Sequence, residues 1–261
     1  MLDNANKSSS FRRIAWIGGG FLTLMLLIAA VERKKGMMVG ATVVEVEPLE
    51  DGALLIDSMD VIKLVERSIG SSLDEQNASL VDEDQVERAL EENLFVKNAE
   101  VLLTANSNIK INIEQRVPIL RVVDKLGVQY YLDKEGAKVP LSRHFTARTL
   151  VATGNIPPHT PEFLTKKNNG MKDLFELTNF ILSDPLWKAM FEQVHINAKD
   201  EFVLVPIVGD QSIILGKLDT DVEAKFKKLQ TFYEEGFSRE GWQKYKTIDL
   251  RFRNQVVCER K

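Results

Sequence analysis

The side chains that most often do chemistry in proteins are few in this chain and lie far apart. It has three histidines, His144, His159 and His195, and one cysteine, Cys258. Catalysis needs a nucleophile or an acid–base pair with support, and a metal centre needs three or more ligands. The histidines share no ligand spacing, and neither His-Glu-x-x-His nor Gly-x-Ser-x-Gly occurs. The sequence therefore predicts no catalytic residue, no metal site and no cofactor.

A pair of opposite charges lies near the C-terminus. Asp249 and Arg251 are two residues apart within 246–253 (KTIDLRFR), a run whose composition is typical of a strand. Alternate residues of a strand point to the same side, so we expect the two charges to pair with each other or with neighbours. Such a pair is either purely structural or part of a surface that receives a partner, and both interpretations stay open.

The last residues are expected to form a terminal strand. Val256, Val257 and Cys258 have high β-propensity or small apolar side chains, so we interpret Cys258 as a packing residue and not as a nucleophile. A strand at the edge of a sheet carries unpaired N–H and C=O groups that accept a strand from another chain. The charged residues 259–261 limit uncontrolled self-pairing. This edge is the candidate interaction site.

One segment predicts a membrane span. Residues 14–31 form an uncharged apolar run of 18 residues, which as a helix is about 27 Å long and close to the thickness of the hydrocarbon core. Cations flank it on both sides, at Arg12 and Arg13 and again at 33–35. We expect a signal anchor with a cytoplasmic N-terminus and the bulk of the chain outside the cytoplasm. A cleaved signal peptide is the alternative, disfavoured by the length of the run.

Composition excludes one class of partner. The 261 residues carry 34 Lys and Arg against 38 Asp and Glu, a net charge of −4, so no basic field is available to neutralise phosphates. The chain is not expected to bind nucleic acid. Its content of 44% hydrophobic and 28% charged residues is that of a globular protein, and the length suffices for two modest domains.

Hydrophobic periodicity in the first section predicts the order strand, helix, helix, strand, strand. Asp57 and Asp82 are expected to cap the two helices. Three isoleucines at 109, 111 and 113 alternate with polar residues, which puts them on one face for the helices to cover. The predicted strands are 42–46, 96–103 and 109–113. The predicted helical stripes are Ile62, Val65 and Ile69, and Val86, Ala89, Leu90 and Leu94.

From Val117 onward the pattern is dominated by strands. Hairpins are predicted from 120–123 to 128–132 and from 202–207 to 212–215. One helix is expected over 171–181, ending near Pro185, and another begins at a capping box formed by Thr220 and Glu223. That second helix places Val222, Phe226, Leu229 and Tyr233 on one face. Trp187 and Trp242 are expected to be core residues.

Three stretches together resemble one known family. They are 95–101 (FVKNAEV) followed by 109–118 (IKINIEQRVP), then 131–136 (YLDKEG), and 247–252 (TIDLRF). Their order and spacing behind a single anchor are similar to the bacterial cell-division family FtsQ, also called DivIB. A departure is that Arg253, Asn254 and Gln255 stand where the family often has glycines, and no tail follows the last strand.

The resemblance implies an α+β fold with a cytoplasmic tail at 1–13, a transmembrane helix at 14–31, a POTRA-type βααββ domain at 36–116 and an FtsQ-type β-domain with helices at 117–261. It further implies a non-enzymatic, single-pass scaffold of the inner membrane at the division septum, which links early to late division proteins. Its implied partners are FtsB- and FtsL-type proteins and other divisome membrane proteins. The residues expected to contact a partner are Arg251, Phe252, Asn254, Val256, Val257 and Cys258, with Tyr233 on the preceding helix.

Two other functions stay open at this stage. One is a membrane-tethered enzyme acting on the cell wall, against which the lack of a recognisable site argues. The other is a POTRA-containing protein of envelope assembly, in which such domains usually repeat and precede a transmembrane barrel.

Overall fold

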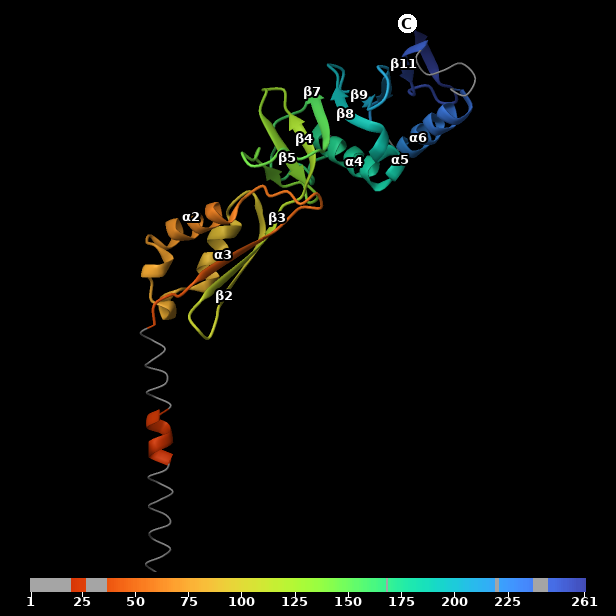
Figure 1. The fold of residues 1–261 in the computed structure, drawn as a ribbon. Helices are drawn as coiled ribbons and strands as arrows, with labels where there is room; N and C mark the ends of the chain where they lie inside the picture. Colours follow the sequence, from red (N-terminus) through yellow and green to blue (C-terminus); the bar gives the residue numbers. More distant parts are fainter. Residues whose placement is uncertain (1–19, 27–36, 168, 219–220, 237–243) are drawn as a thin grey trace, which may run out of the picture. The chain divides into compact units, whose positions relative to one another are not determined.

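The computed structural model describes residues 20–26, 37–167, 169–218, 221–236 and 244–261 (Figure 1). Of the predicted span at 14–31, only 20–26 fall within these ranges, and they are helical and exposed. No helix within the described ranges is both long enough and apolar enough to cross a membrane. The described residues fall into two compact units, one within 1–48 and 56–115, the other within 49–55 and 116–261. Together they confirm the α+β class.

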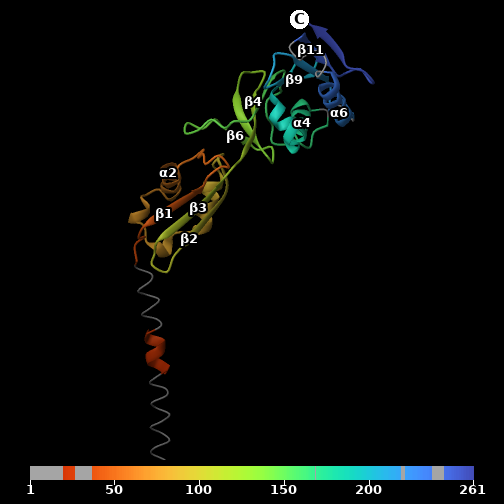
Figure 2. The same ribbon diagram turned by 45° about the vertical axis from the view of Figure 1, so that its right-hand side comes forward.

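The first unit has the predicted order of elements. Its three strands form one sheet in the order β1-β3-β2, with β1 parallel and β2 antiparallel to the central β3 (Figure 2). Two short 3-10 turns, η1 (Leu73–Glu75) and η2 (Ala78–Leu80), lie between the helices. The elements are β1 (Thr42–Glu47), α2 (Ser58–Ile69), α3 (Glu83–Glu91), β2 (Val96–Leu103) and β3 (Ile109–Gln115).

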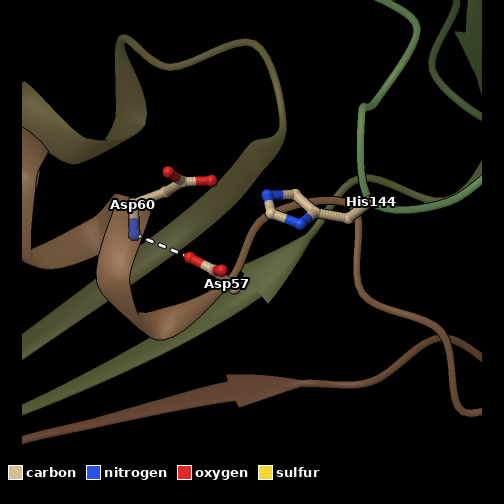
Figure 3. Close-up of side chains that lie close together, drawn as sticks. All are labelled: Asp57, Asp60 and His144. Carbon is tan, nitrogen blue, oxygen red and sulfur yellow. Dashed lines mark hydrogen bonds between the residues drawn. The ribbon is translucent and has the colours of Figure 1, made fainter.

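Both helices begin at the predicted caps. Asp57 Oδ1 accepts a hydrogen bond from the backbone N–H of Asp60 at 2.7 Å (Figure 3), and Asp82 Oδ1 accepts one from the N–H of Gln85 at 3.0 Å. Each bond satisfies an N–H that the first helical turn leaves without a partner. Helix α2 ends at Gly70, whose φ of 82° is the left-handed conformation that glycine adopts without a steric penalty.

The core of the first unit lies between the helices and one face of the sheet. Ile109, Ile111 and Ile113 are all buried, as their alternation predicted. The buried stripe of α2 runs through Val61 and Val65, so Ile62, predicted to lie on it, is only half-buried. The prediction for Leu94 was wrong. Helix α3 ends at Glu91, three residues before Leu94, and Leu94 is 55% exposed.

The second unit is built on one sheet in the order β12-β11-β10-β9-β8-β7-β4-β5-β6. The two predicted hairpins are confirmed as the antiparallel pairs β4 with β5 and β9 with β10. The strands are β4 (Pro118–Val123), β5 (Gln129–Asp133), β6 (Lys138–Val139), β7 (Leu150–Gly154), β8 (Phe191–Ile196), β9 (Phe202–Pro206), β10 (Ser212–Gly216), β11 (Tyr245–Asp249) and β12 (Val257–Arg260).

The sheet of the second unit is covered by the helices α4 (Gly170–Ser183), α5 (Pro185–Met190) and α6 (Val222–Thr231) (Figure 1). A short π-helical turn, η3 (Phe232–Gly236), follows α6. The rings of Trp187 and Phe226 meet edge to face at 5.0 Å, and Phe191 stacks on Trp187 at 6.0 Å. Trp187 is a core residue, as predicted. Trp242 and Thr220 lie outside the described residues.

Candidate partner-binding edge

Strand β12 forms one edge of the nine-stranded sheet. It pairs antiparallel with β11, with Asp249 opposite Val257 and Ile248 opposite Cys258. Within the described part of the chain no strand pairs with its other side. The terminal edge strand that the sequence predicted is therefore present. It starts one residue later than expected, because Val256 belongs to the preceding connection.

The N–H groups of β12 alternate in direction along the strand. Lys261 N donates to Lys244 O at 3.0 Å, on the side of β11, so Glu259 and Val257, two and four residues earlier, also turn their N–H groups toward β11. The hydrogen bonds at the end of β11 lead to the same assignment of N–H directions. Leu250 N donates to Ile214 O of β10 at 2.9 Å, so the N–H of the preceding residue points toward β12. The N–H of Cys258, between Val257 and Glu259, therefore points away from β11.

The side chains of β12 divide between core and surface. Val257 is 40% exposed, whereas Cys258 is half-buried and packs, with Val256, against the core. Burial raises the pKa of the Cys258 thiol, which keeps it protonated at neutral pH and agrees with its interpretation as a packing residue. At the far end, Lys261 Nζ lies 2.7 Å from Asp210 Oδ2 and ties the chain end to the β9–β10 turn.

An ion-pair network holds the connection between β11 and β12. Arg251 Nη2 lies 2.6 Å from Asp249 Oδ2, and its Nη1 lies 2.8 Å from Glu201 Oε1. The predicted pairing of Asp249 with Arg251 is confirmed. Its cause differs from the one expected, because β11 ends at Asp249 and Arg251 reaches the carboxylate from a loop. The Arg251 N–H also donates to Asp249 Oδ1 at 3.0 Å, so one carboxylate fixes both backbone and side chain of that loop.

The charges of this network shift one another's pKa values. Burial alone would raise the pKa of Asp249, but hydrogen bonds and charge attraction from Arg251 outweigh it and the pKa is lowered. The pKa of Glu201 is lowered by hydrogen bonds first from Asn197 and then from Arg251. Both carboxylates are therefore ionised at neutral pH, and the pKa of Arg251 is raised in return, first by Asp249 and then by Glu201.

Sequence reasoning missed two other residues that shape this loop. Lys228 of α6 donates from Nζ to Leu250 O at 2.9 Å and to Phe252 O at 2.6 Å, and burial lowers its pKa. Gly216, at the end of β10 with φ of 84°, leaves room for the stem of Arg251, because a Cβ there would lie 2.8 Å from Arg251 Cγ. Neither role follows from spacing, since both residues are remote from the loop along the chain.

The predicted contact residues fall into two groups. Six of them, at 251, 252, 254 and 256–258, form the loop and strand of the edge; Phe252 and Asn254 are exposed in the turn. Tyr233 belongs to a different surface. Its hydroxyl accepts a hydrogen bond from Gln211 Nε2 at 3.3 Å, and its ring lines a mainly apolar cavity of about 420 Å³ beside α5.

The histidines of the second unit make ordinary structural contacts. His159 lies between the rings of Tyr130 and Phe163, at centroid distances of 6.1 and 5.4 Å. His195 Nδ1 lies 3.0 Å from Thr153 Oγ1. These contacts give both histidines a structural role in the packing of the second unit.

Comparison with known proteins places the edge within a matched region. The family model described as "FtsQ/DivIB, C-terminal related" matches residues 117–259, more than half of the chain, from the residue before β4 into β12. The chain is also similar to the "Cell division protein FtsQ" of Rhodothermus marinus, with 26% identity over 209 residues that cover 79% of this chain and 74% of that protein. These matches agree with the resemblance of the three short stretches, and the chain belongs to the FtsQ/DivIB family.

Proposed function

We propose that this chain is a non-enzymatic scaffold of the bacterial cell-division machinery that docks a partner polypeptide by backbone pairing at β12. Membership of the FtsQ/DivIB family and the similarity to a cell-division protein support a role at the division septum. The family membership favours this function over a cell-wall enzyme or a protein of envelope assembly. The proposed partners are FtsB- and FtsL-type proteins and other membrane proteins of the divisome.

The proposed layout follows the family. A tail at 1–13 lies in the cytoplasm, a helix at 14–31 anchors the chain in the inner membrane, and the rest lies outside the cytoplasm. The first unit, with its order of strand, helix, helix, strand and strand, is proposed to be a POTRA-type domain over 36–116 that helps localisation. The β-domain of 117–261 carries the partner site.

The observation that carries the proposal is the open side of β12. The outward N–H and carbonyl groups at Cys258 are arranged as the template to which another strand adds. The exposed side chain of Val257 gives an added strand apolar area to bury. The network of Arg251 with Asp249 and Glu201 holds the beginning of the connection that leads from β11 to β12, which limits the rearrangement needed when a partner binds.

Proline substitution at Cys258 tests the proposal. Cys258→Pro removes an outward N–H donor and places a ring where a partner strand would lie, and we expect it to weaken binding of a purified FtsB-type partner at least about tenfold, as loss of a hydrogen bond with an added clash implies. Binding is measured by titration of the full chain in detergent. Cys258→Ala is the matched control, because it keeps the N–H and should bind within about threefold of wild type.

Circular dichroism and a cooperative unfolding transition verify that both variants remain folded. If the folded Cys258→Pro variant binds the partner as tightly as Cys258→Ala does, the partner does not pair with this edge.

A further inference from the structure

The first unit has an edge strand that is longer than β12. In the sheet order β1-β3-β2, strand β2 runs over eight residues and, among the described strands, has a neighbour on one side only. Alternate residues of such a strand turn their N–H groups away from the sheet, and here these are Ala99, Val101 and Leu103. Left unpaired, they would form a second template for an incoming strand, comparable to β12.

Each of these three N–H groups instead meets a glutamate of helix α3. The shortest bond joins Val101 to Glu87 at the middle of the strand. The bonds run from Ala99 N to Glu91 Oε1 at 3.4 Å, from Val101 N to Glu87 Oε1 at 2.7 Å and from Leu103 N to Glu83 Oε1 at 3.3 Å.

Two regular periods make this match possible. Residues two apart on a strand are separated by about 6.6 Å, and residues four apart on a helix rise by about 6.0 Å. The glutamates are four residues apart, and their partners are two apart in the reverse order, so α3 runs antiparallel to β2. Val86 and Leu90, both buried in the core, hold the helix against the sheet.

We propose that Glu83, Glu87 and Glu91 close the β2 edge to strand addition. A strand arriving at β2 has to displace three hydrogen bonds to carboxylates and then face those carboxylates with its own carbonyl groups. The closure stands on the contacts of the first unit alone. Its consequence, that a partner strand is directed to β12, rests on the proposed function.

Hydrogen exchange in the full chain, solubilised in detergent, tests the closure. In the triple variant Glu83→Ala, Glu87→Ala, Glu91→Ala, the amides of Ala99, Val101 and Leu103 should exchange at least about tenfold faster than in wild type. The amides of the intervening residues, which face β3, serve as the internal reference and should change little. Alanine is the better helix former, so α3 is expected to remain helical, which circular dichroism verifies.

Two matched variants show whether slow exchange depends on the hydrogen-bond acceptors of the glutamates or on their negative charge. The triple variant Glu83→Gln, Glu87→Gln, Glu91→Gln keeps an acceptor oxygen at each site and should keep the slow exchange of wild type. A second control, Glu47→Ala, Glu75→Ala, Glu92→Ala, removes the same number of charges from exposed positions of the first unit and should also leave the three amides protected. If the alanine variant leaves their exchange unchanged, the glutamates are not the acceptors and the closure is refuted.

The opened edge should also pair between copies of the chain. Sedimentation velocity is expected to show concentration-dependent self-association of the Glu→Ala triple variant and of neither control. Adding Val101→Pro to that variant removes the central donor and should reverse the association. Fast exchange with no gain in association would overturn the proposal. None of these readouts involves β12, so failure here is distinct from failure of partner binding at Cys258.

Discussion

At the scale of single residues, Asp249 is the anchor of the candidate edge. Its carboxylate accepts hydrogen bonds from the backbone N–H and from the guanidinium of Arg251, and Asp249 is only 8% exposed. Sequence spacing predicted the pairing of these two charges, because residues two apart in an extended run are near each other whether or not the second is in a strand. It did not predict the ion pair of Arg251 with Glu201, because Glu201 is 50 residues away along the chain and only the folded sheet brings the two together.

The lowered pKa of Asp249 predicts an acid-dependent loss of stability. A carboxyl group whose pKa is lower in the folded than in the unfolded state stabilises the fold above the unfolded value, here near 3.8, and this contribution is lost as the pH falls through the folded value. Asp249→Asn should lower the free energy of unfolding by about 1–2 kcal/mol at neutral pH, after allowance for the solvent exposure of Arg251.

Urea titrations at pH 7 and at successive values below 4 measure this difference. The gap in unfolding free energy between wild type and Asp249→Asn should narrow as the pH falls. A gap that stays constant down to pH 2 would mean that the ionised carboxylate of Asp249 does not stabilise the fold.

At the scale of elements, patterns in the sequence predicted what local periodicity determines. Hairpins β4–β5 and β9–β10 and the caps of α2 and α3 follow from short-range alternation and turn residues. Strands β7 and β8 were not predicted. β7 pairs in parallel with β4 and β8, neither adjacent to it in sequence, so no turn marks it. Helix α5 was missed because Pro185, interpreted as a helix end, occupies the first turn of a new helix.

The packing of β10 against the β11–β12 loop gives an element-level prediction. Gly216→Ala introduces a Cβ 2.8 Å from Arg251 Cγ at a φ of 84°, so it adds a clash to backbone strain. We expect a loss of about 2–3 kcal/mol in unfolding free energy and weaker partner binding, as the loop shifts.

Gly127→Ala is the matched control, since its φ is 81° and no atom lies within 4 Å of the added Cβ. It should lose about 1 kcal/mol through strain alone and leave binding unchanged. Equal losses in the two variants would show that Arg251 does not need the space at Gly216.

At the scale of the whole molecule, the family resemblance carried by three short stretches is confirmed by matches over most of the chain. The position of β12 at the sheet edge was predicted from the composition and place of its residues. The direction of its N–H groups was not, because it depends on the register with β11 and on the bond from Lys261 to Lys244. The sequence likewise did not predict the hydrogen bonds between the β2 backbone and the glutamates of α3. An acidic helix alone predicts only a solvated face, and the spacing of its glutamates gains meaning once the strand lies beside it.

Amide hydrogen exchange of the full chain, alone and saturated with an FtsB-type partner, shows whether a partner strand pairs with the backbone of β12. The amide of Cys258 should exchange at least about tenfold more slowly in the complex, while those of Ala99, Val101 and Leu103 should keep their rates. Unchanged exchange of the Cys258 amide in the saturated complex would show that the partner does not pair with β12.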